Sequence, residues 1–248
     1  MTTAWKALVE SRLRSNIEQI GVSATYMSLA TVKPDNTPAN RTVVFRGFSG
    51  QDHREDTGWQ SDLLVITTDI RSQKMKHIAH NPIVEVNWFM PGTQEQFRLY
   101  GKVHVVGHHI SPPEDLNKRV MPTKRVDPLT VKELATKAFL INSKNDSVSF
   151  NWQSERLRQW YRMNDDLRAT FATDCPLNSL KIKDVDINSG WFIGYDDVQQ
   201  RLLETGYENF VVLLLDVEKV DHVVLPTGEH SLYHKVRNDN RWSITRLN

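Results

Sequence analysis

Two arginines flank a β-branched run in the segment NRTVVFRG, and both could bind an anion. Arg41 and Arg46 are five residues apart, so in a regular strand their side chains face opposite sides. For both to contact one ligand, the strand needs a bulge, or the ligand must be elongated and meet them at opposite ends.

A second cationic segment, TTDIRSQK, follows about twenty residues later, where a strand is expected to run into a helix. It supplies two hydroxyls, Thr67 and Thr68, and then Arg71, Ser72 and Lys74. The first turn of a helix exposes backbone N–H groups, and its dipole favours an anion. The segment therefore indicates a local phosphate site, while ordinary solvated charges at a helix start are the alternative interpretation.

Gln96 and Arg98 form a third polar pair, in a segment whose residues alternate between polar and apolar. Being two apart, they share one face of their strand, and Phe97 faces the other way. An amide that both donates and accepts could bind a polar heterocycle. A polar outer surface of the sheet is the alternative.

Other kinds of site are not indicated. The chain has no G-x-G-x-x-G, P-loop or G-x-S-x-G pattern. His77 and His80 are three apart with only Ile and Ala between them, which favours hydrogen-bonded or solvated histidines, and no metal site is predicted. Cys175 precedes a proline and is expected to be inert rather than a reactive thiol.

The elements that must position these residues are mainly strands. An amphipathic helix is predicted over 4–20, ending at Gly21, and a short helix over 71–82. Strands are predicted over 25–32, 39–48, 61–69, 82–90, 95–107, 209–225 and the two C-terminal segments HSLYHKV and RWSITRL. The fold class is therefore mainly β with flanking helices (α+β), built around a closed antiparallel barrel.

Two regions break the strand pattern. Residues from about 112 to 172 are predicted to be helical, and the stretch CPLNSLKIKDVDINSGWFIGYDDVQQ is interpreted as a mixed linker without a clear period. The apolar run in 209–225 is continuous, as expected for a strand that is buried on both faces.

The overall composition excludes several classes of protein. The 248 residues carry 31 Lys plus Arg and 30 Asp plus Glu, a formal net charge of +1, which argues against coating nucleic acid or an anionic membrane. The single cysteine rules out an intrachain disulfide, so a reducing, cytoplasmic location is expected. No apolar run approaches the roughly 18 residues of a membrane span.

Three segments occur in one order: RTVVFRGF, VITTDIRSQK and QEQFRLYGKV. In this order and spacing the chain resembles the pyridoxamine 5′-phosphate oxidase-like, FMN-binding split-barrel family, and most closely its cyanobacterial and plant branch with a T-D-x-R-S-x-K motif. The pattern R-x-x-x-W at Arg156–Trp160 and the pattern W-x-x-x-x-L at Trp242 also fit. The resemblance implies a single split-barrel domain over 1–248, with six barrel strands, helix 4–20 and a helical insertion at about 112–172. It also implies a homodimer with one FMN at each of two subunit interfaces.

Carried over residue by residue, the resemblance implies an FMN site made by Arg41, Val43, Val44, Arg46, Thr67, Thr68, Arg71, Ser72, Lys74, Gln96, Gln153, Ser154 and Lys235. Arg41, Lys74 and Ser72 would meet the phosphate, and Arg71 would replace a cation that the family carries where this chain has Gln73.

The remaining positions imply contacts to the rest of the flavin. Val43, Val44 and Thr67 lie where the family places backbone contacts to the ring, Thr68 lies near the ribityl chain or phosphate, and Gln96 matches a glutamine on the isoalloxazine. Gln153, Ser154 and Lys235 would come from the partner chain. Arg46 lies near flavin and substrate, which makes it the candidate catalytic residue.

The chain departs from the family where the substrate would bind. The family's R-x-H reads Ser231-Leu232-Tyr233 here, which disfavours pyridoxamine phosphate as the substrate. The sequence therefore predicts an FMN-dependent oxidoreductase acting on a small molecule. A non-catalytic FMN-binding or carrier protein is the main alternative, and a cofactor-free interaction module is the third.

Overall fold

The structure is a computed structural model that describes residues 3–51, 58–122, 150–172, 180–186, 191–236 and 241–247. Its helices are α1 (Ala4–Ile20), α2 (Gln73–His80), α4 (Trp152–Tyr161), α5 (Asp165–Ala169) and α6 (Asp197–Asn209), with 3-10 turns η1 (Gly21–Thr25) and η2 (Glu114–Arg119). Its strands are β1 (Tyr26–Val32), β2 (Pro38–Phe48), β3 (Trp59–Gln60), β4 (Leu64–Asp69), β5 (Ile83–Met90), β6 (Glu95–Val106), β7 (Met121–Pro122), β8 (Ile182–Asp186), β9 (Trp191–Gly194), β10 (Phe210–Val224), β11 (Glu229–Lys235) and β12 (Trp242–Leu247).

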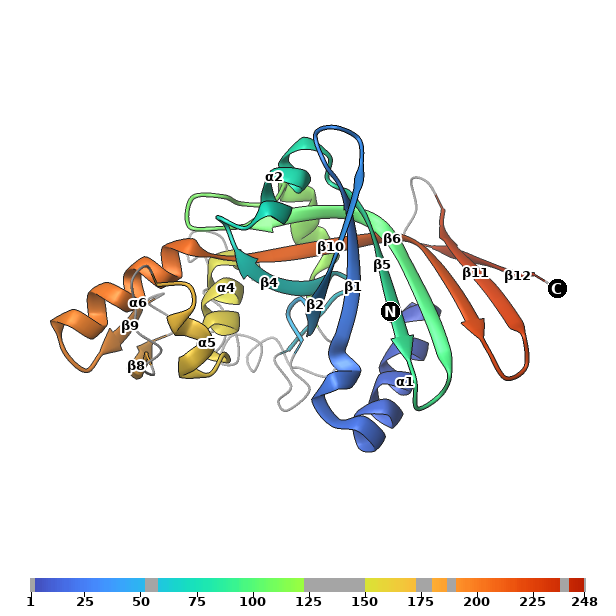
Figure 1. The fold of residues 1–248 in the computed structure, drawn as a ribbon, viewed down its shortest axis with the longest axis horizontal. Helices are drawn as coiled ribbons and strands as arrows, with labels where there is room; N and C mark the ends of the chain where they lie inside the picture. Colours follow the sequence, from blue (N-terminus) through green and yellow to red (C-terminus); the bar gives the residue numbers. More distant parts are fainter. Residues whose placement is uncertain are drawn as a thin grey trace.

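Six antiparallel strands close into a barrel in the order β10-β4-β2-β1-β5-β6, because β10 pairs with β4 on one side and with β6 on the other. β11 and β12 extend the sheet beyond β10 (Figure 1). The predicted mainly β barrel with flanking helices is therefore confirmed, and the barrel strands begin and end within a few residues of the sequence expectation.

The central strand β10 is buried on both faces, as its continuous apolar run predicts. Residues 210–215 are all fully buried. Val211, Leu213 and Leu215 point into the barrel core, whereas Val212 and Leu214 belong to a second apolar core on the outer face of the sheet. That second core includes Trp160 of α4 and Leu203 of α6, so the helices cover this side of the barrel.

Helix α1 covers another part of the barrel with only part of its predicted apolar stripe. Trp5, Val9 and Leu13 are buried in the barrel core. Ile17 and Ile20 are 43% and 39% exposed, because the helix runs past the barrel at its C-terminal end. The helix stops at Gly21, whose φ of +66° is favourable for glycine.

The region after the barrel differs from the sequence expectation. Within the stretch interpreted as a linker, β8 and β9 pair as a two-stranded sheet, and α6 begins after Asp196, whose side chain accepts a hydrogen bond from the Gln199 backbone N–H. Leu203 and Gly206 of α6 are buried, and Leu202 and Tyr207 pack against the second core beside them. Of the predicted helical insertion, η2, α4 and α5 are seen. Residues 123–149 and Cys175 lie outside the described residues.

Among the described residues, no helix is both long enough and apolar enough to cross a membrane.

Candidate functional site

The junction between β4 and α2 carries a cluster of hydroxyl and cationic side chains. β4 ends at Asp69, whose backbone carbonyl accepts from the Ser72 N–H at 3.1 Å, and this turn redirects the chain into α2. Ser72 stands at the N-cap of α2, yet its side chain makes no capping hydrogen bond. Its hydroxyl is therefore available to this cluster.

Lys74 reaches back from the first turn of α2 across that junction. Its Nζ donates to Thr68 Oγ1 at 2.7 Å and to Ser72 Oγ at 3.0 Å. The two hydroxyl oxygens are themselves 3.4 Å apart. One ammonium and two hydroxyls thus form a compact cluster at the junction.

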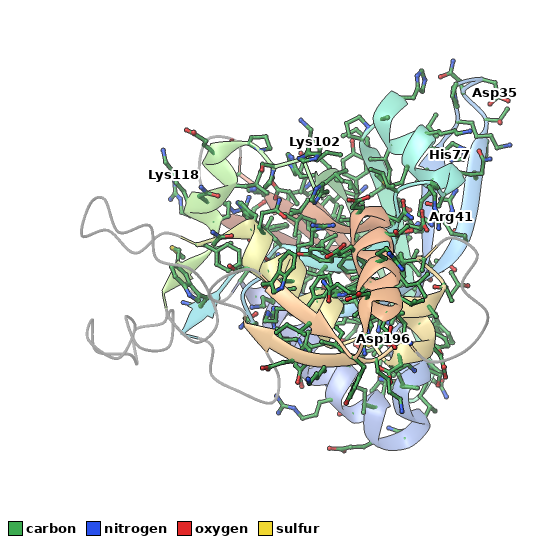
Figure 2. The ribbon with its side chains drawn as sticks, turned by 90° about the vertical axis from the view of Figure 1, so that its left-hand side faces the viewer. Asp35, Arg41, His77, Lys102, Lys118 and Asp196 are labelled. Atoms are coloured by element: carbon green, nitrogen blue, oxygen red, sulfur yellow. The ribbon has the colours of Figure 1, made fainter. Side chains whose placement is uncertain are left out.

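Arg41 of β2 supplies the second cation. Its Nη1 donates to the backbone oxygen of Leu29 at 3.0 Å and to Thr31 Oγ1 at 2.7 Å, both on the neighbouring strand β1. Its Nη2 lies 3.4 Å from Nδ1 of His77, a buried residue on α2. Figure 2 shows Arg41 and His77 together at the end of the molecule where β1, β2 and α2 meet. The guanidinium is therefore fixed in position before any ligand arrives.

The electrostatics of this cluster favour an anion. Burial lowers the pKa of Lys74, and the nearby Arg41 charge lowers it further, while Asp69 acts in the opposite direction. Burial also lowers the pKa of Arg41. Asp69 is itself held by Arg71, with Nε–Oδ1 at 2.9 Å and Nη2–Oδ2 at 2.6 Å. Two partly desolvated cations with hydroxyl donors fit a phosphate of −1.5 to −2 charge.

Arg71 bonds Asp69 and not the group formed by Lys74, Thr68 and Ser72. Besides its bonds to Asp69, its Nη2 donates to the backbone oxygen of Phe171 at 3.2 Å, and the Asp69 contact raises its pKa. Its expected role as a replacement phosphate cation stays a prediction, and one that would need the guanidinium to leave Asp69.

Arg46 lies on the opposite face of β2, as the five-residue spacing predicts. Its Nε donates to Thr67 Oγ1 at 3.2 Å, and burial together with the positive charge of Arg162 lowers its pKa. A bulge, one of the two alternatives for bringing both arginines to one ligand, is present in β2: the β2–β4 register shifts between Phe45 and Phe48. Arg46 therefore sits inside an irregularity that can turn its side chain relative to Arg41.

Val43 and Val44 follow the same alternation. Val43 is 8% exposed and packs in the barrel core, whereas Val44 is half-buried on the outer face, opposite Tyr26 of β1. Their backbone groups run between the two arginines. The strand could thus connect a phosphate held at Arg41 to a ring held near Arg46.

Gln96 and Arg98 share the outer face of β6, and Phe97 is buried in the core, as predicted. Gln96 Nε2 donates to Asn87 Oδ1 at 2.7 Å, so the amide oxygen of Gln96 faces away from this bond. Arg98 Nη2 bonds Asp221 Oδ2 at 2.6 Å. Within one chain these residues form a polar outer surface, and they do not reach the cationic cluster.

The three residues expected from a partner chain are engaged within this one. Gln153 Nε2 donates to the Gly107 carbonyl at 2.9 Å, and Ser154 is buried in the first turn of α4. Lys235 Nζ bonds Asp216 Oδ1 at 3.2 Å. Asp216 lies five residues along β10 from Val211, the partner of Thr68, which is roughly 16 Å in a strand.

Thr31 and His77 are the residues at this site that sequence reasoning missed. His77 had been weighed only with His80 as a metal pair, but His80 is exposed while His77 is buried against Thr31. The signal was the spacing of Lys74 and His77, which are three apart and so share a face of a helix. Thr31 has no sequence signal, because its contact comes from strand pairing.

The chain thus combines a six-stranded barrel of the split-barrel class with a cationic cluster at the β4–α2 junction. Residues 2–107 match the family model described as pyridoxamine 5′-phosphate oxidase, FMN-binding domain. The matched region contains both Arg41 and the β4–α2 junction, so this part of the chain is similar to that family.

Curated relatives match part of the chain. The chain is 36% identical to pyridoxine/pyridoxamine 5′-phosphate oxidase 2 of Arabidopsis thaliana over 102 residues. These aligned residues make up 41% of this chain and 46% of the relative. The chain is 32% identical over 89 residues to pyridoxine/pyridoxamine 5′-phosphate oxidase of Pseudomonas entomophila, 36% of each chain. The chain therefore spans less than half the length of the curated relatives it matches.

Solved structures resemble the whole chain. A pyridoxamine 5′-phosphate oxidase-related, FMN-binding protein from Nostoc punctiforme is 26% identical with a TM-score of 0.63, covering 100% of this chain and 99% of that one. PhzG from Burkholderia lata shares the fold. It is 13% identical with a TM-score of 0.53, and the match covers 97% of this chain and 91% of that one.

Proposed function

We propose that the protein binds FMN and acts as an FMN-dependent oxidoreductase on a small molecule. The observation that carries the proposal is a cluster of two cations and two hydroxyls: Lys74 bonds Thr68 and Ser72, and the charge of Arg41 acts on Lys74. The match of residues 2–107 to an FMN-binding domain supports FMN as the phosphate ester. When bound, FMN supplies hydride or electron transfer, and the protein supplies binding and orientation.

Each residue has a distinct role in this proposal. Arg41 and Lys74 hold the phosphate. Arg46, half-buried beside Thr67 and Arg162, provides positive charge on the other face of β2. This charge would stabilise reduced flavin or polarise an anionic substrate, which makes Arg46 the proposed catalytic residue.

The proposed assembly is a homodimer with FMN at the subunit interface. Tyr26 and Phe89 support it, since they are 48% and 46% exposed on the outer barrel face, opposite Val44 and Gln96 in their ladders. A second copy placed there would cover both aromatic rings and bring its own polar groups to Gln96. Light scattering on the FMN-loaded protein should give about twice 28.7 kDa; a monomer carrying FMN would refute the shared site.

The main alternative is a flavin-binding or carrier protein without catalysis, and one observation favours it. Tyr233 stands where the family's substrate-reading histidine would be, and it is 8% exposed and packed in the barrel core. Its ring is therefore turned away from any substrate. Turnover assays with pyridoxamine 5′-phosphate and with reduced nicotinamides separate the two functions, because a carrier retains FMN but turns over neither.

The absorbance spectrum of the purified protein tests FMN binding directly, and an Arg41→Ala variant tests the site. We expect a flavin band in the native protein and an FMN affinity weakened by about 1–3 kcal/mol in the variant, the value of a charge-assisted hydrogen bond. Lys76→Ala is the matched control, because Lys76 is exposed on the same helix as Lys74. An unchanged FMN affinity in Arg41→Ala would exclude this cluster as the phosphate site.

A further inference from the structure

A buried histidine lies directly behind the cationic cluster, and the proposed function gives it no role. His77 Nδ1 lies 3.0 Å from Thr31 Oγ1, in a contact buried from solvent. The same hydroxyl accepts from Arg41 Nη1 at 2.7 Å, and Arg41 Nη2 approaches the same ring nitrogen at 3.4 Å. Thr31, His77 and Arg41 therefore form one closed arrangement, in which each member contacts the other two.

Hydrogen-bond chemistry fixes the protonation state of this ring nitrogen. A guanidinium has only donors, so Arg41 can only donate to Thr31 and to His77. Because the oxygen of Thr31 already accepts from Arg41, its hydroxyl proton is free to point at Nδ1. With the hydroxyl in this orientation, both neighbours of Nδ1 donate to it, and Nδ1 is an unprotonated acceptor. His77 is consequently neutral, with its proton on Nε2.

The surrounding charges act in the same direction. Burial lowers the pKa of His77, and the positive charges of Arg41 on β2 and Lys33 in the β1–β2 turn lower it further, while Asp35 in that turn opposes them. Figure 2 shows Asp35, His77 and Arg41 following one another along this end of the molecule. A proton on Nδ1 would face the guanidinium of Arg41, which has no acceptor, and the Thr31 hydroxyl would have to turn from donor to acceptor. The contact of Nδ1 with Arg41 would then have to break.

We propose that neutral His77 is a positioning residue that holds Arg41 in its phosphate-binding position through Thr31, so that protonation of His77 releases Arg41 and weakens FMN binding in acid. The inference rests on the proposed function, since it deepens the role of Arg41 in that site. It adds a pH dependence located in the protein, distinct from the protonation of the ligand phosphate, whose second pKa is near 6.

A His77→Asn variant separates the two sources of pH dependence. The Oδ1 of asparagine replaces Nδ1 as an acceptor that does not titrate, and the ligand phosphate titrates equally in both proteins. FMN dissociation constants are measured by flavin fluorescence between pH 7.5 and 5.5. We expect similar affinities at pH 7.5, and at pH 5.5 a loss in the native protein at least roughly fivefold greater than in the variant, as for one lost charged hydrogen bond. His80→Asn, an exposed change on the same helix, should behave as the native protein.

The outcomes distinguish the inference from the proposed function. Absence of FMN binding at every pH would refute the proposed function itself. FMN binding with equal pH dependence in native protein and His77→Asn would overturn the role of His77 alone.

Two further measurements keep the test decisive if His77→Asn folds poorly. Thr31→Ser should retain the native pH dependence and Thr31→Val should lose affinity at pH 7.5, because only the first keeps the bridging hydroxyl. Imidazole NMR of the ligand-free protein should show His77 as the neutral Nε2–H tautomer at pH 7.5. The Nδ1–H tautomer or a charged ring at that pH would overturn the inference without any flavin present.

Discussion

We expect Lys74 to strengthen FMN binding but to lower the free energy of unfolding of the ligand-free protein. Its ammonium is partly buried and is repelled by Arg41, and its hydrogen-bond acceptors among the described residues are two neutral hydroxyls. The nearby carboxylate of Asp69 is held by Arg71. A Lys74→Met variant keeps the aliphatic stem and removes this charge.

The structure gives the size of both effects. In Lys74→Met the hydroxyls of Thr68 and Ser72, 3.4 Å apart, can bond each other, so no buried polar group is left unsatisfied. Because Lys74 is only partly buried, we expect a small gain of about 0.5–1 kcal/mol in the free energy of unfolding, or about 1–4 °C in Tm. FMN binding should lose about 2 kcal/mol with the charged hydrogen bonds, which is roughly a thirtyfold higher Kd.

The two effects predict a reversal that thermal unfolding can detect. With FMN at a hundred times the native Kd, binding stabilises the native protein by about 2.7 kcal/mol and the variant by about 0.9 kcal/mol. The variant should therefore melt above the native protein without FMN and below it with FMN. Lys76→Met, exposed on the same helix, should shift neither value. A lower Tm of Lys74→Met without ligand, or an unchanged FMN affinity, would refute the reasoning.

Two further changes test the barrel that carries the site. Gly101→Ala places a Cβ 2.1 Å from the backbone oxygen of Asp216, so chemical unfolding should show a loss of about 3 kcal/mol or more, since the β6–β10 ladder that closes the barrel must shift; a loss below about 1 kcal/mol would contradict this packing. Burial raises the pKa of Asp221, but hydrogen bonds from Arg98 and His230 outweigh it and hold that pKa below the ordinary 3.8. This interaction stabilises the fold above pH 3.8 and is lost as the pH falls through the lowered pKa. Asp221→Asn should therefore cost about 0.5–1 kcal/mol at neutral pH and flatten the acid end of the stability profile, and an unchanged profile would show that Asp221 is not responsible.

Much of the barrel could be predicted from local patterns because each strand carries its own evidence. The alternation of Gln96, Phe97 and Arg98 gave the inner and outer faces of β6. The continuous apolar run of β10 indicated burial on both sides, which the two cores on its opposite faces explain. Helix α6 was missed because its first turn lies within the stretch interpreted as a linker, although Leu202, Leu203, Gly206 and Tyr207 recur at helical spacing.

The candidate site divides in the same way. Arg41, Ser72 and Lys74 were found from motif order, because the chemistry of a phosphate site requires cations and hydroxyls at a helix start. Their separation from Gln96 and Lys235 could not be read from the sequence, since it depends on which strands pair and in which register.

The sequence by itself determined the strand pattern, the cation-rich β4–α2 segment and the opposite facing of Arg41 and Arg46, because periodicity and residue type are local properties. Only the tertiary structure decided that Arg71 is engaged by Asp69 and that Thr31 and His77 hold Arg41 from behind. Thr31 and Arg41 meet through the antiparallel register of β1 and β2, and His77 meets them because α2 packs on that end of the barrel. Contacts between residues ten to forty-six positions apart follow from strand register and helix packing, which no local pattern records.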